Sequence, residues 1–202
     1  MLPSGFVYVS EFIPSVREDI RYAGSHNFMG RPVDGYKAPR TVLTCEAAVA
    51  LKAAADAFAK KGYTLLLYDG YRPQRAVSHF MRWAEDLTDT IAKAEFYPDL
   101  DKAELFEKGY IAKRSGHSRG STIDLTLLDS AGRALDMGGE FDWFSPVSGH
   151  GYPDLTDAQK ANRLLLKQGM IDAGFLPYSE EWWHYRLKDE PYPDTYFDFV
   201  IE

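Results

Sequence analysis

A histidine and an aspartate seven positions apart are the first residues whose types suggest metal chemistry. His117 lies in a loop bounded by Gly116 and Gly120, and Asp124 follows in the next segment. Imidazole nitrogens and carboxylate oxygens are ordinary zinc ligands, and the glycines let the backbone bend so that the histidine folds back toward the aspartate. Alone, such a pair is more often a simple hydrogen-bonded contact, so a metal site needs a further ligand.

The sequence EEWWHY near the C-terminus contains a candidate for that ligand. Glu181 precedes His184 by three residues, beside two tryptophans. A catalytic zinc needs three protein ligands and one open position for water, and it lowers the pKa of that water from near 16 to about 7. We therefore predict His184 as the third ligand and Glu181 as the base that takes the proton. The structural alternative pairs Glu181 with an arginine and packs His184 against the tryptophans.

Strand geometry sets a condition on this pair. Residues three apart in one strand point to opposite faces of the sheet. We therefore expect Glu181 in a bend before the last strand and His184 within the strand.

An arginine follows the first apolar strand, in the sequence Asp69-Gly70-Tyr71-Arg72-Pro73. An arginine at a strand-to-helix turn can point into a cleft, where it stabilises the oxyanion of a tetrahedral intermediate. A surface salt bridge of Arg72 is an equally good interpretation of this segment alone.

The elements that must position these residues can be predicted from apolar periodicity and turn residues. Helices are expected at 44–61, with Thr44 as N-cap, and at 73–87, 101–108 and 156–173. Strands are expected near the N-terminus, at 64–68, at 121–128 and at 182–187. In the third of these, Thr122, Asp124 and Thr126 share one face. The irregular spacing of the elements predicts an α+β fold, a single domain over residues 1–202 with a central, mostly antiparallel sheet flanked by helices.

Composition excludes several classes of function. The chain has 202 residues, of which 45% are hydrophobic, and a formal net charge of −7. Nucleic acids and anionic membranes bind positive surfaces, so neither is expected as a partner. The N-terminus lacks the pattern of a secretory signal, so a cytoplasmic location is the default expectation. A homodimer stays open.

Several collinear motifs resemble the zinc D-alanyl-D-alanine dipeptidases of the vancomycin-resistance type, within the wider group of D,D-carboxypeptidases and hedgehog-like domains. Ser115 to Asp124 matches the pattern S-x-H-x-x-G-x-x-x-D, and Glu181 to His184 matches E-x-W-H. The resemblance extends over nearly the whole chain through further stretches: DGYRP at 69–73, IRYA at 20–23, NF at 27–28, PVDGY at 32–36, FEKGYIA at 106–112, DMG at 136–138 and FD at 141–142.

This resemblance implies a fold, an activity and a site. The fold would be hedgehog/D,D-peptidase-like. The reaction would be hydrolysis of the small D-Ala-D-Ala dipeptide by a zinc-activated water, with a link to the bacterial cell wall and its peptidoglycan. One Zn²⁺ per chain would be held by His117, Asp124 and His184. Glu181 would be the general base, and Arg72 would polarise the scissile carbonyl.

The resemblance also implies three substrate-binding residues. Tyr22, Ser115 and Asp142 would line a small pocket for the two ends of the dipeptide, with the Asp142 carboxylate suited to the substrate's ammonium group. Gly116 departs from the serine that is frequent at this position in the family, and it is not a ligand position.

Three other functions compete with this interpretation. The sequence GHSRG fits the G-x-S-x-G nucleophile elbow, with Ser118 as nucleophile, but an elbow lies between a strand and a helix, and the segment that follows here is strand-like. A non-catalytic zinc-binding module would lack the base, whereas Glu181 is present. A D,D-carboxypeptidase acting on longer peptidoglycan peptides is the closest alternative, because its zinc chemistry is the same.

Overall fold

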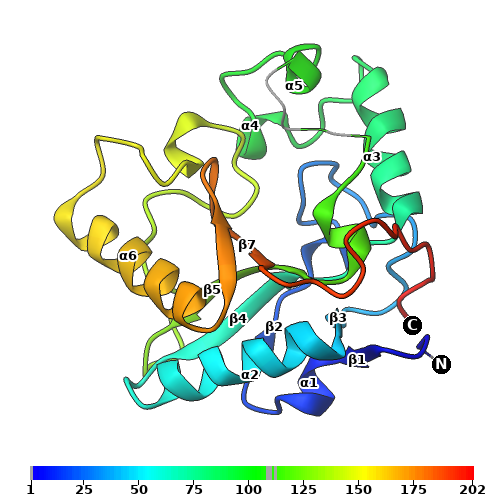
Figure 1. Ribbon diagram of the computed structural model, residues 1–202. Coiled ribbons are helices and arrows are strands. Elements are labelled where there is room, and N and C mark those ends of the chain that lie inside the picture. The colour runs from blue at the N-terminus through cyan, green and yellow to red at the C-terminus, as the bar shows by residue number, and fades with distance from the viewer. Residues whose placement is uncertain (1, 108–110, 112) are drawn as a thin grey trace.

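A five-stranded sheet forms the centre of the computed structural model, which describes residues 2–107, 111 and 113–202 (Figure 1). Its strands lie in the order β2-β4-β5-β7-β6, with β2 parallel to β4 and the other three pairs antiparallel. A separate two-stranded ladder joins β1 to β3. The strands are β1 (Phe6–Tyr8), β2 (Arg17–Glu18), β3 (Val42–Thr44), β4 (Thr64–Asp69), β5 (Thr122–Leu128), β6 (Phe175–Tyr178) and β7 (Glu181–Leu187). The prediction of an α+β fold with a mostly antiparallel sheet is confirmed.

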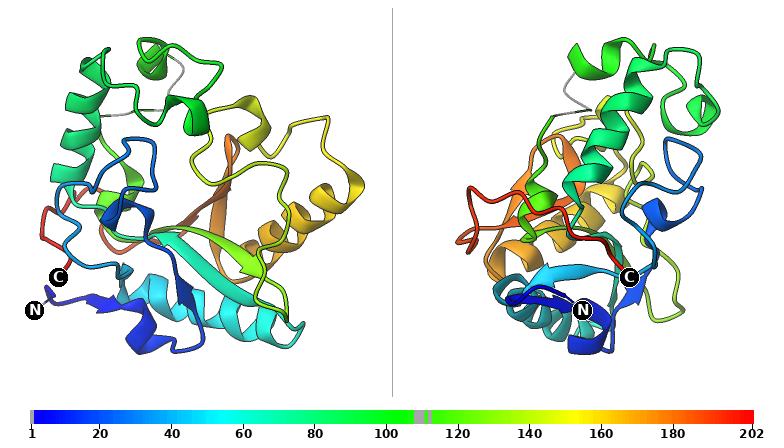
Figure 2. Two further views of the ribbon diagram at one scale, coloured as in Figure 1. Left: turned by 180° about the vertical axis from the view of Figure 1, so that it is seen from behind. Right: turned by 90° about the vertical axis from the view of Figure 1, so that its right-hand side faces the viewer.

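Helices cover the sheet and join its strands. They are α1 (Val9–Phe12), α2 (Cys45–Ala59), α3 (Gln74–Glu85), α4 (Lys93–Phe96), α5 (Glu104–Glu107) and α6 (Asp157–Asp172), with 3-10 turns η1 (Arg21–Ala23), η2 (Gly116–Arg119) and η3 (Pro146–Ser148). In both views of Figure 2, α2 lies at the bottom of the molecule and α3, α4 and α5 lie at the top, while α6 flanks the sheet and contacts α2. Within the described residues, no helix is long and apolar enough to cross a membrane.

The two long helices begin at side-chain caps. The Thr44 hydroxyl accepts from the backbone N–H of Ala47 at the start of α2. Thr156 and Gln159 form a reciprocal capping box at the start of α6, which satisfies two N–H groups that the helix itself leaves unpaired. The predictions of these helices are confirmed to within two residues at each end.

Two helix predictions need correction. Pro73 is the N-cap of α3 rather than its first helical residue, so its missing N–H removes no bond from the helix. The helix expected at 101–108 is the short α5, Glu104–Glu107. Lys108 lies outside the described residues, as do 109, 110 and 112 of the FEKGYIA stretch.

Strand β5 is buried along its entire length. Ile123, Leu125 and Leu127 are fully buried, as their apolar face predicts. The opposite face carries Asp124 at 2% exposure and does not meet water. A buried carboxylate needs compensating partners, so the polar face of β5 marks the place where other polar side chains must gather.

Two irregularities in strand pairing bring side chains to this face. Between β4 and β5 the register shifts after Leu67, so that Asp69 pairs with Asp124. Between β6 and β7 the register shifts after Pro177, so that Tyr178 pairs with Glu181 while Pro177 pairs with Tyr185. Extra residues in one strand re-aim its side chains.

The second irregularity corrects a prediction. Glu181 lies within β7 rather than in a bend before it. The shift in register, and not a strand boundary, turns Glu181 toward the same side as His184.

We expect Gly169→Ala to destabilise the fold. A Cβ at Gly169 in α6 would lie 2.2 Å from the ring of Phe58, a side chain on α2 that is 1% exposed. The overpacking outweighs the gain in helix propensity, for a net loss of about 1–2 kcal/mol in the free energy of unfolding. Urea unfolding of wild type and variant measures this loss in the free energy of unfolding.

Gly24→Ala is the matched control. A Cβ at Gly24 meets nothing within 4 Å, and its φ is −119°, so its effect should stay within about 0.5 kcal/mol. Equal stability of the two variants would contradict the close packing of α2 on α6.

Candidate metal centre and active site

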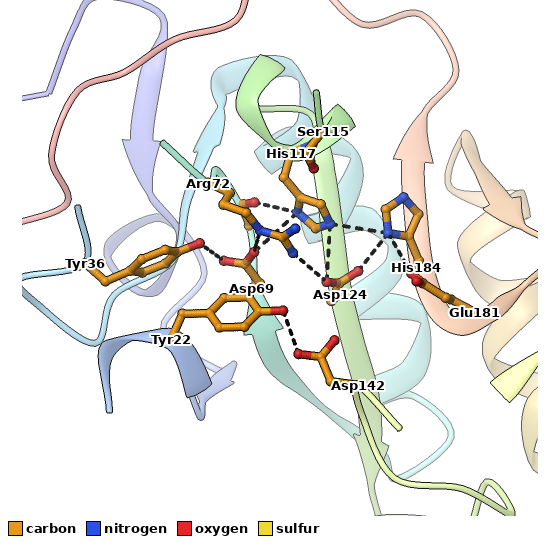
Figure 3. Close-up of polar contacts among 11 residues, drawn as sticks. Tyr22, Tyr36, Asp69, Arg72, Ser115, His117, Asp124, Asp142, Glu181 and His184 are labelled. Atoms are coloured by element: carbon orange, nitrogen blue, oxygen red, sulfur yellow. Dashed lines mark hydrogen bonds and ion pairs between the residues drawn. The ribbon is translucent and has the colours of Figure 1, made fainter. Parts of the chain in front are cut away.

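Three side chains converge on the buried face of β5 (Figure 3). His117 comes from η2, Asp124 from β5 and His184 from β7, and one ligand atom of each lies within 4.8 Å of the others. The Nε2 of His117 lies 3.2 Å from Oδ2 of Asp124, and Nδ1 of His184 lies 3.1 Å from Oδ1 of the same carboxylate. Strand pairing places Asp124 directly opposite His184, so β5 and β7 bring two of the three ligands together.

Local structure of η2 directs His117 toward this group. The Ser115 side chain caps the turn by accepting from the His117 N–H at 3.3 Å. Gly120 ends the turn at φ 82°, and a Cβ there would lie 2.4 Å from the Phe6 ring. The glycine requirement anticipated for this loop is therefore confirmed at Gly120.

The hydrogen bond of the His117 ring leaves its second nitrogen ready to bind a metal ion. Nδ1 of His117 lies 2.7 Å from the carbonyl oxygen of Gly70, which can only accept, so Nδ1 carries the proton. In the neutral ring the Nε2 lone pair then faces the Asp124 carboxylate and, at 3.3 Å, Nδ1 of His184. A metal ion at this point would bind both the Nε2 lone pair and the carboxylate. A carbonyl that orients a histidine in this way is typical of metal sites.

The electrostatics of Asp124 agree with this assignment. Burial by itself raises the pKa of the carboxyl, but the adjacent His117 and His184 rings outweigh burial and hold the pKa far below its ordinary value. Asp124 is therefore an anion. Two imidazoles, one carboxylate and an open side are a donor set suited to catalytic zinc.

Arg72 lies next to the metal group and is held by a second buried carboxylate. Its Nε donates to Oδ2 of Asp69 at 2.9 Å, and its terminal nitrogen lies 3.7 Å from Asp124. Tyr36 donates to the other oxygen of Asp69 at 2.7 Å. The alternative of a surface salt bridge is wrong, because the Arg72 side chain is only 13% exposed.

Asp69 and Tyr36 were not among the predicted site residues. Asp69 is 1% exposed, and its burial raises its pKa although Arg72 and His117 oppose this. Both residues lie within the DGYRP and PVDGY stretches, which were the signal available in the sequence. What the motifs did not indicate is that these two stretches meet to hold Arg72.

Glu181 lies at the accessible edge of the group. Its Oε2 is 3.4 Å from Nδ1 of His184, and its side chain is 29% exposed. Burial raises the pKa of Glu181, the Asp124 charge adds to this, and the His184 ring opposes it. A carboxylate with a raised pKa is a better proton acceptor at neutral pH. The structural alternative for Glu181, a pairing with an arginine, is not what the geometry shows.

Tyr22 and Asp142 lie together beside Asp124 (Figure 3). The Tyr22 hydroxyl donates to Oδ2 of Asp142 at 2.6 Å. Asp142 is 7% exposed and has φ 60°, the only positive φ of a non-glycine among the described residues. Burial raises the pKa of Asp142 to about 8, opposed by Tyr22 and Arg72. A strained, buried carboxyl of this kind is typical of a functional site.

These residues share one cavity of about 230 Å³. Ser115 and Asp142 both line it, on opposite sides of the metal group (Figure 3). Its apolar walls come from Phe28, Val77, Phe80, Ile111 and Phe144. All eight predicted site residues line this cavity, together with Arg114 and Tyr178, which sequence reasoning missed because no motif distinguishes them.

Ser118 does not reach the cavity. It is fully buried, and it lies in a turn that precedes a strand instead of following one. The nucleophile-elbow hypothesis is therefore wrong.

Sequence comparisons relate the chain to known proteins over nearly its whole length. A family model described as D-ala-D-ala dipeptidase, of the Peptidase M15 group, matches residues 3–202. The chain is 49% identical to a D-alanyl-D-alanine dipeptidase of Streptomyces coelicolor, over 97% of this chain and 98% of the relative. It is 47% identical to that of Enterococcus faecalis, over 99% and 100%. A solved structure of a VanY D,D-pentapeptidase variant in complex with Zn(II) aligns at 16% identity and a TM-score of 0.45, over 74% of each chain.

Fold, donor set and sequence together define a metallopeptidase hydrolase. The chain belongs to the D-Ala-D-Ala dipeptidase family of the Peptidase M15 group. The resemblance inferred from the motifs is thereby confirmed, and so is the dipeptidase activity that it implied.

We expect Asp142→Asn to change how stability depends on pH in the metal-free protein. The folded pKa of about 8 lies above the unfolded value of about 3.9. The folded state therefore binds more protons between these values, and Asp142 lowers the free energy of unfolding as pH rises through this window. Asparagine removes the effect, so the variant should gain stability relative to wild type from about pH 4 to about pH 9.

Urea unfolding in the presence of a chelator tests this expectation. A constant offset between wild type and Asp142→Asn at every pH would mean that folding does not raise the pKa of Asp142. Asp136→Asn is a suitable control, because that exposed carboxyl has a lowered pKa and should lose its contribution in acid instead.

Proposed function

We propose that the chain hydrolyses D-Ala-D-Ala to two molecules of D-alanine in a single domain over residues 1–202, with one Zn²⁺ held by His117, Asp124 and His184. The convergence of these ligands beside Glu181 carries the proposal. Zinc at this position would acidify a water molecule and polarise the peptide carbonyl. The remaining roles belong to the chain's own residues.

Glu181 is proposed as the general base. Its carboxylate accepts a proton from the attacking water as the new C–O bond forms at the scissile carbonyl. It then returns that proton to the amide nitrogen as the C–N bond breaks, so that the leaving group departs as a neutral amine. The raised pKa of Glu181 supports both transfers, and its partial exposure supports access to water.

Arg72 is proposed to stabilise the oxyanion. Its guanidinium is fixed by Asp69 and lies 5.0 Å from the Tyr22 ring and 5.3 Å from the Phe80 ring. A donor held in place before the reaction stabilises developing charge without reorganising. Asp69 and Tyr36 thus support Arg72 without contacting the substrate.

The two ends of the dipeptide are assigned to opposite sides of the cavity. Asp142, with Tyr22, would bind the substrate's ammonium group, and that positive charge would lower the raised pKa of Asp142. The Ser115 hydroxyl would bind at the carboxylate end. A buried carboxyl at the amino end favours a free dipeptide over a longer peptide, in which this nitrogen is acylated and uncharged. This distinguishes the proposal from a D,D-carboxypeptidase.

Two further expectations accompany the proposal. A cytoplasmic location and a homodimer stay predictions from the sequence.

Glu181→Gln should keep the metal and lose turnover. Glutamine preserves the shape of the side chain but cannot accept the proton, so kcat should fall by about 100- to 10,000-fold. Zinc content, measured by elemental analysis after gel filtration, should stay near one per chain. His117→Ala is the contrasting variant and should lose zinc, since it removes a ligand. Wild-type turnover in Glu181→Gln would remove this residue as the base.

The substrate assignment is tested by D-alanine release from free D-Ala-D-Ala and from N-acetyl-D-Ala-D-Ala, each with and without a chelator. We expect chelator-sensitive cleavage of the free dipeptide, with only weak cleavage of the acetylated one. Preference for the acetylated substrate would indicate a carboxypeptidase. Cleavage that survives complete removal of zinc would contradict the metal mechanism.

A further inference from the structure

One arginine holds the loop that carries Asp142. Arg163 lies in α6 and is 4% exposed. Its guanidinium donates to three backbone carbonyl oxygens: Met137 at 2.6 Å, Val147 at 2.7 Å and Gly149 at 2.7 Å. These acceptors lie at the two ends of residues 137–149, here named the Asp142 loop. One side chain therefore ties both ends of the loop together.

Arg163 is an unusual buried cation. Among the described residues, no carboxylate lies within ion-pair distance of its guanidinium, although buried charges in proteins are normally paired. Burial lowers the pKa of Arg163 to about 10. The three carbonyl oxygens take the place of a carboxylate as partners of this charge, and an apolar side chain would leave them without donors. The planar guanidinium can reach several carbonyls in fixed directions, which an apolar residue or a lysine cannot.

The same helix makes two more contacts just before the loop. Gln159 donates to the Asp136 side chain at 2.9 Å, and Asn162 donates to the Asp136 carbonyl at 2.8 Å. Three side chains of α6 thus hold the chain where it enters the loop, and Arg163 also holds it where it leaves. In Figure 1 this loop leads from the sheet toward the start of α6.

The loop needs such support because its centre is strained. Asp142 has φ 60°, a conformation that non-glycine residues adopt only when the surrounding structure enforces it. At the centre of the loop, Phe141 stacks on Tyr68 at 4.6 Å, and Tyr22 holds the Asp142 carboxyl. Fixed ends and a packed centre leave Asp142 one position.

We propose that Arg163 is a positioning residue that sets the enzyme's selectivity for a free amino terminus by fixing the loop on which Asp142 lies. Arg163 acts through the backbone and does not contact the substrate. The inference rests on the proposed role of Asp142 and extends it to a residue outside the cavity.

The test uses Arg163→Lys, which keeps the charge but not the fork of donors. The kcat/KM for free D-Ala-D-Ala should fall by about 10-fold or more, mainly through KM, since lysine cannot reproduce the three hydrogen bonds that hold the ends of the Asp142 loop. The kcat/KM for N-acetyl-D-Ala-D-Ala should not fall, so selectivity between the two substrates declines. Arg133→Lys is the control, because the Arg133 side chain is 79% exposed and lies outside this loop.

A double-mutant cycle with Asp142→Asn separates positioning from general damage. If Arg163 acts through Asp142, then Arg163→Lys should not reduce selectivity further in the Asp142→Asn background. An equal loss on both substrates, or unchanged selectivity in folded, zinc-loaded Arg163→Lys, would overturn the inference. Should Arg163→Lys fail to fold, the double variant Gln159→Ala/Asn162→Ala loosens the start of the loop, and it should lower selectivity in the same direction.

The cycle also distinguishes this inference from the proposed function. Failure of the wild-type protein to cleave D-Ala-D-Ala would contradict the function itself. Full selectivity in Asp142→Asn alone would remove the role of Asp142, and with it the inference about Arg163.

Discussion

A carboxylate buried in the middle of the sheet is the constraint on which the rest of the site depends. Asp124 lies in a strand whose residues are all buried, where a lone charge is strongly unfavourable. Every element around it supplies compensation: η2 contributes His117, β7 contributes His184 and the turn after β4 contributes Arg72. The side chains around Asp124 therefore make its burial possible in addition to forming the site.

Compensation by the chain alone is incomplete. Asp69, Asp124, Asp142 and Glu181 all lie near the buried guanidinium of Arg72. Burial raises the pKa of Asp69, Asp142 and Glu181, and the charge of Asp124 raises each further, which is a sign of excess negative charge. A divalent cation and the ammonium group of a substrate would each reduce that excess. The site is thus electrostatically complementary to what it is proposed to bind.

Stability and function oppose each other most clearly at Asp142. A positive φ and a buried carboxyl both disfavour folding, and helix α6 with Arg163 supplies the bonds that hold the loop despite this. Such local strain is common where a binding group must be ready before the ligand arrives. The loop and α6 are therefore best regarded as one functional unit.

The sequence by itself determined the long helices and the core strands, and it predicted the metal ligands and the base. Their signals are local: caps such as Thr44, the alternation along β5, and motifs whose residue types allow few other chemistries. Only the tertiary structure decided how Asp69 and Tyr36 hold Arg72, how Glu181 reaches the side of His184 from within one strand, and what holds the Asp142 loop. Each of these depends on a shift in strand register or on a contact between segments far apart in the chain. Periodicity along one segment contains no information about which distant backbone carbonyl a buried arginine will meet, because that is settled only when the elements pack.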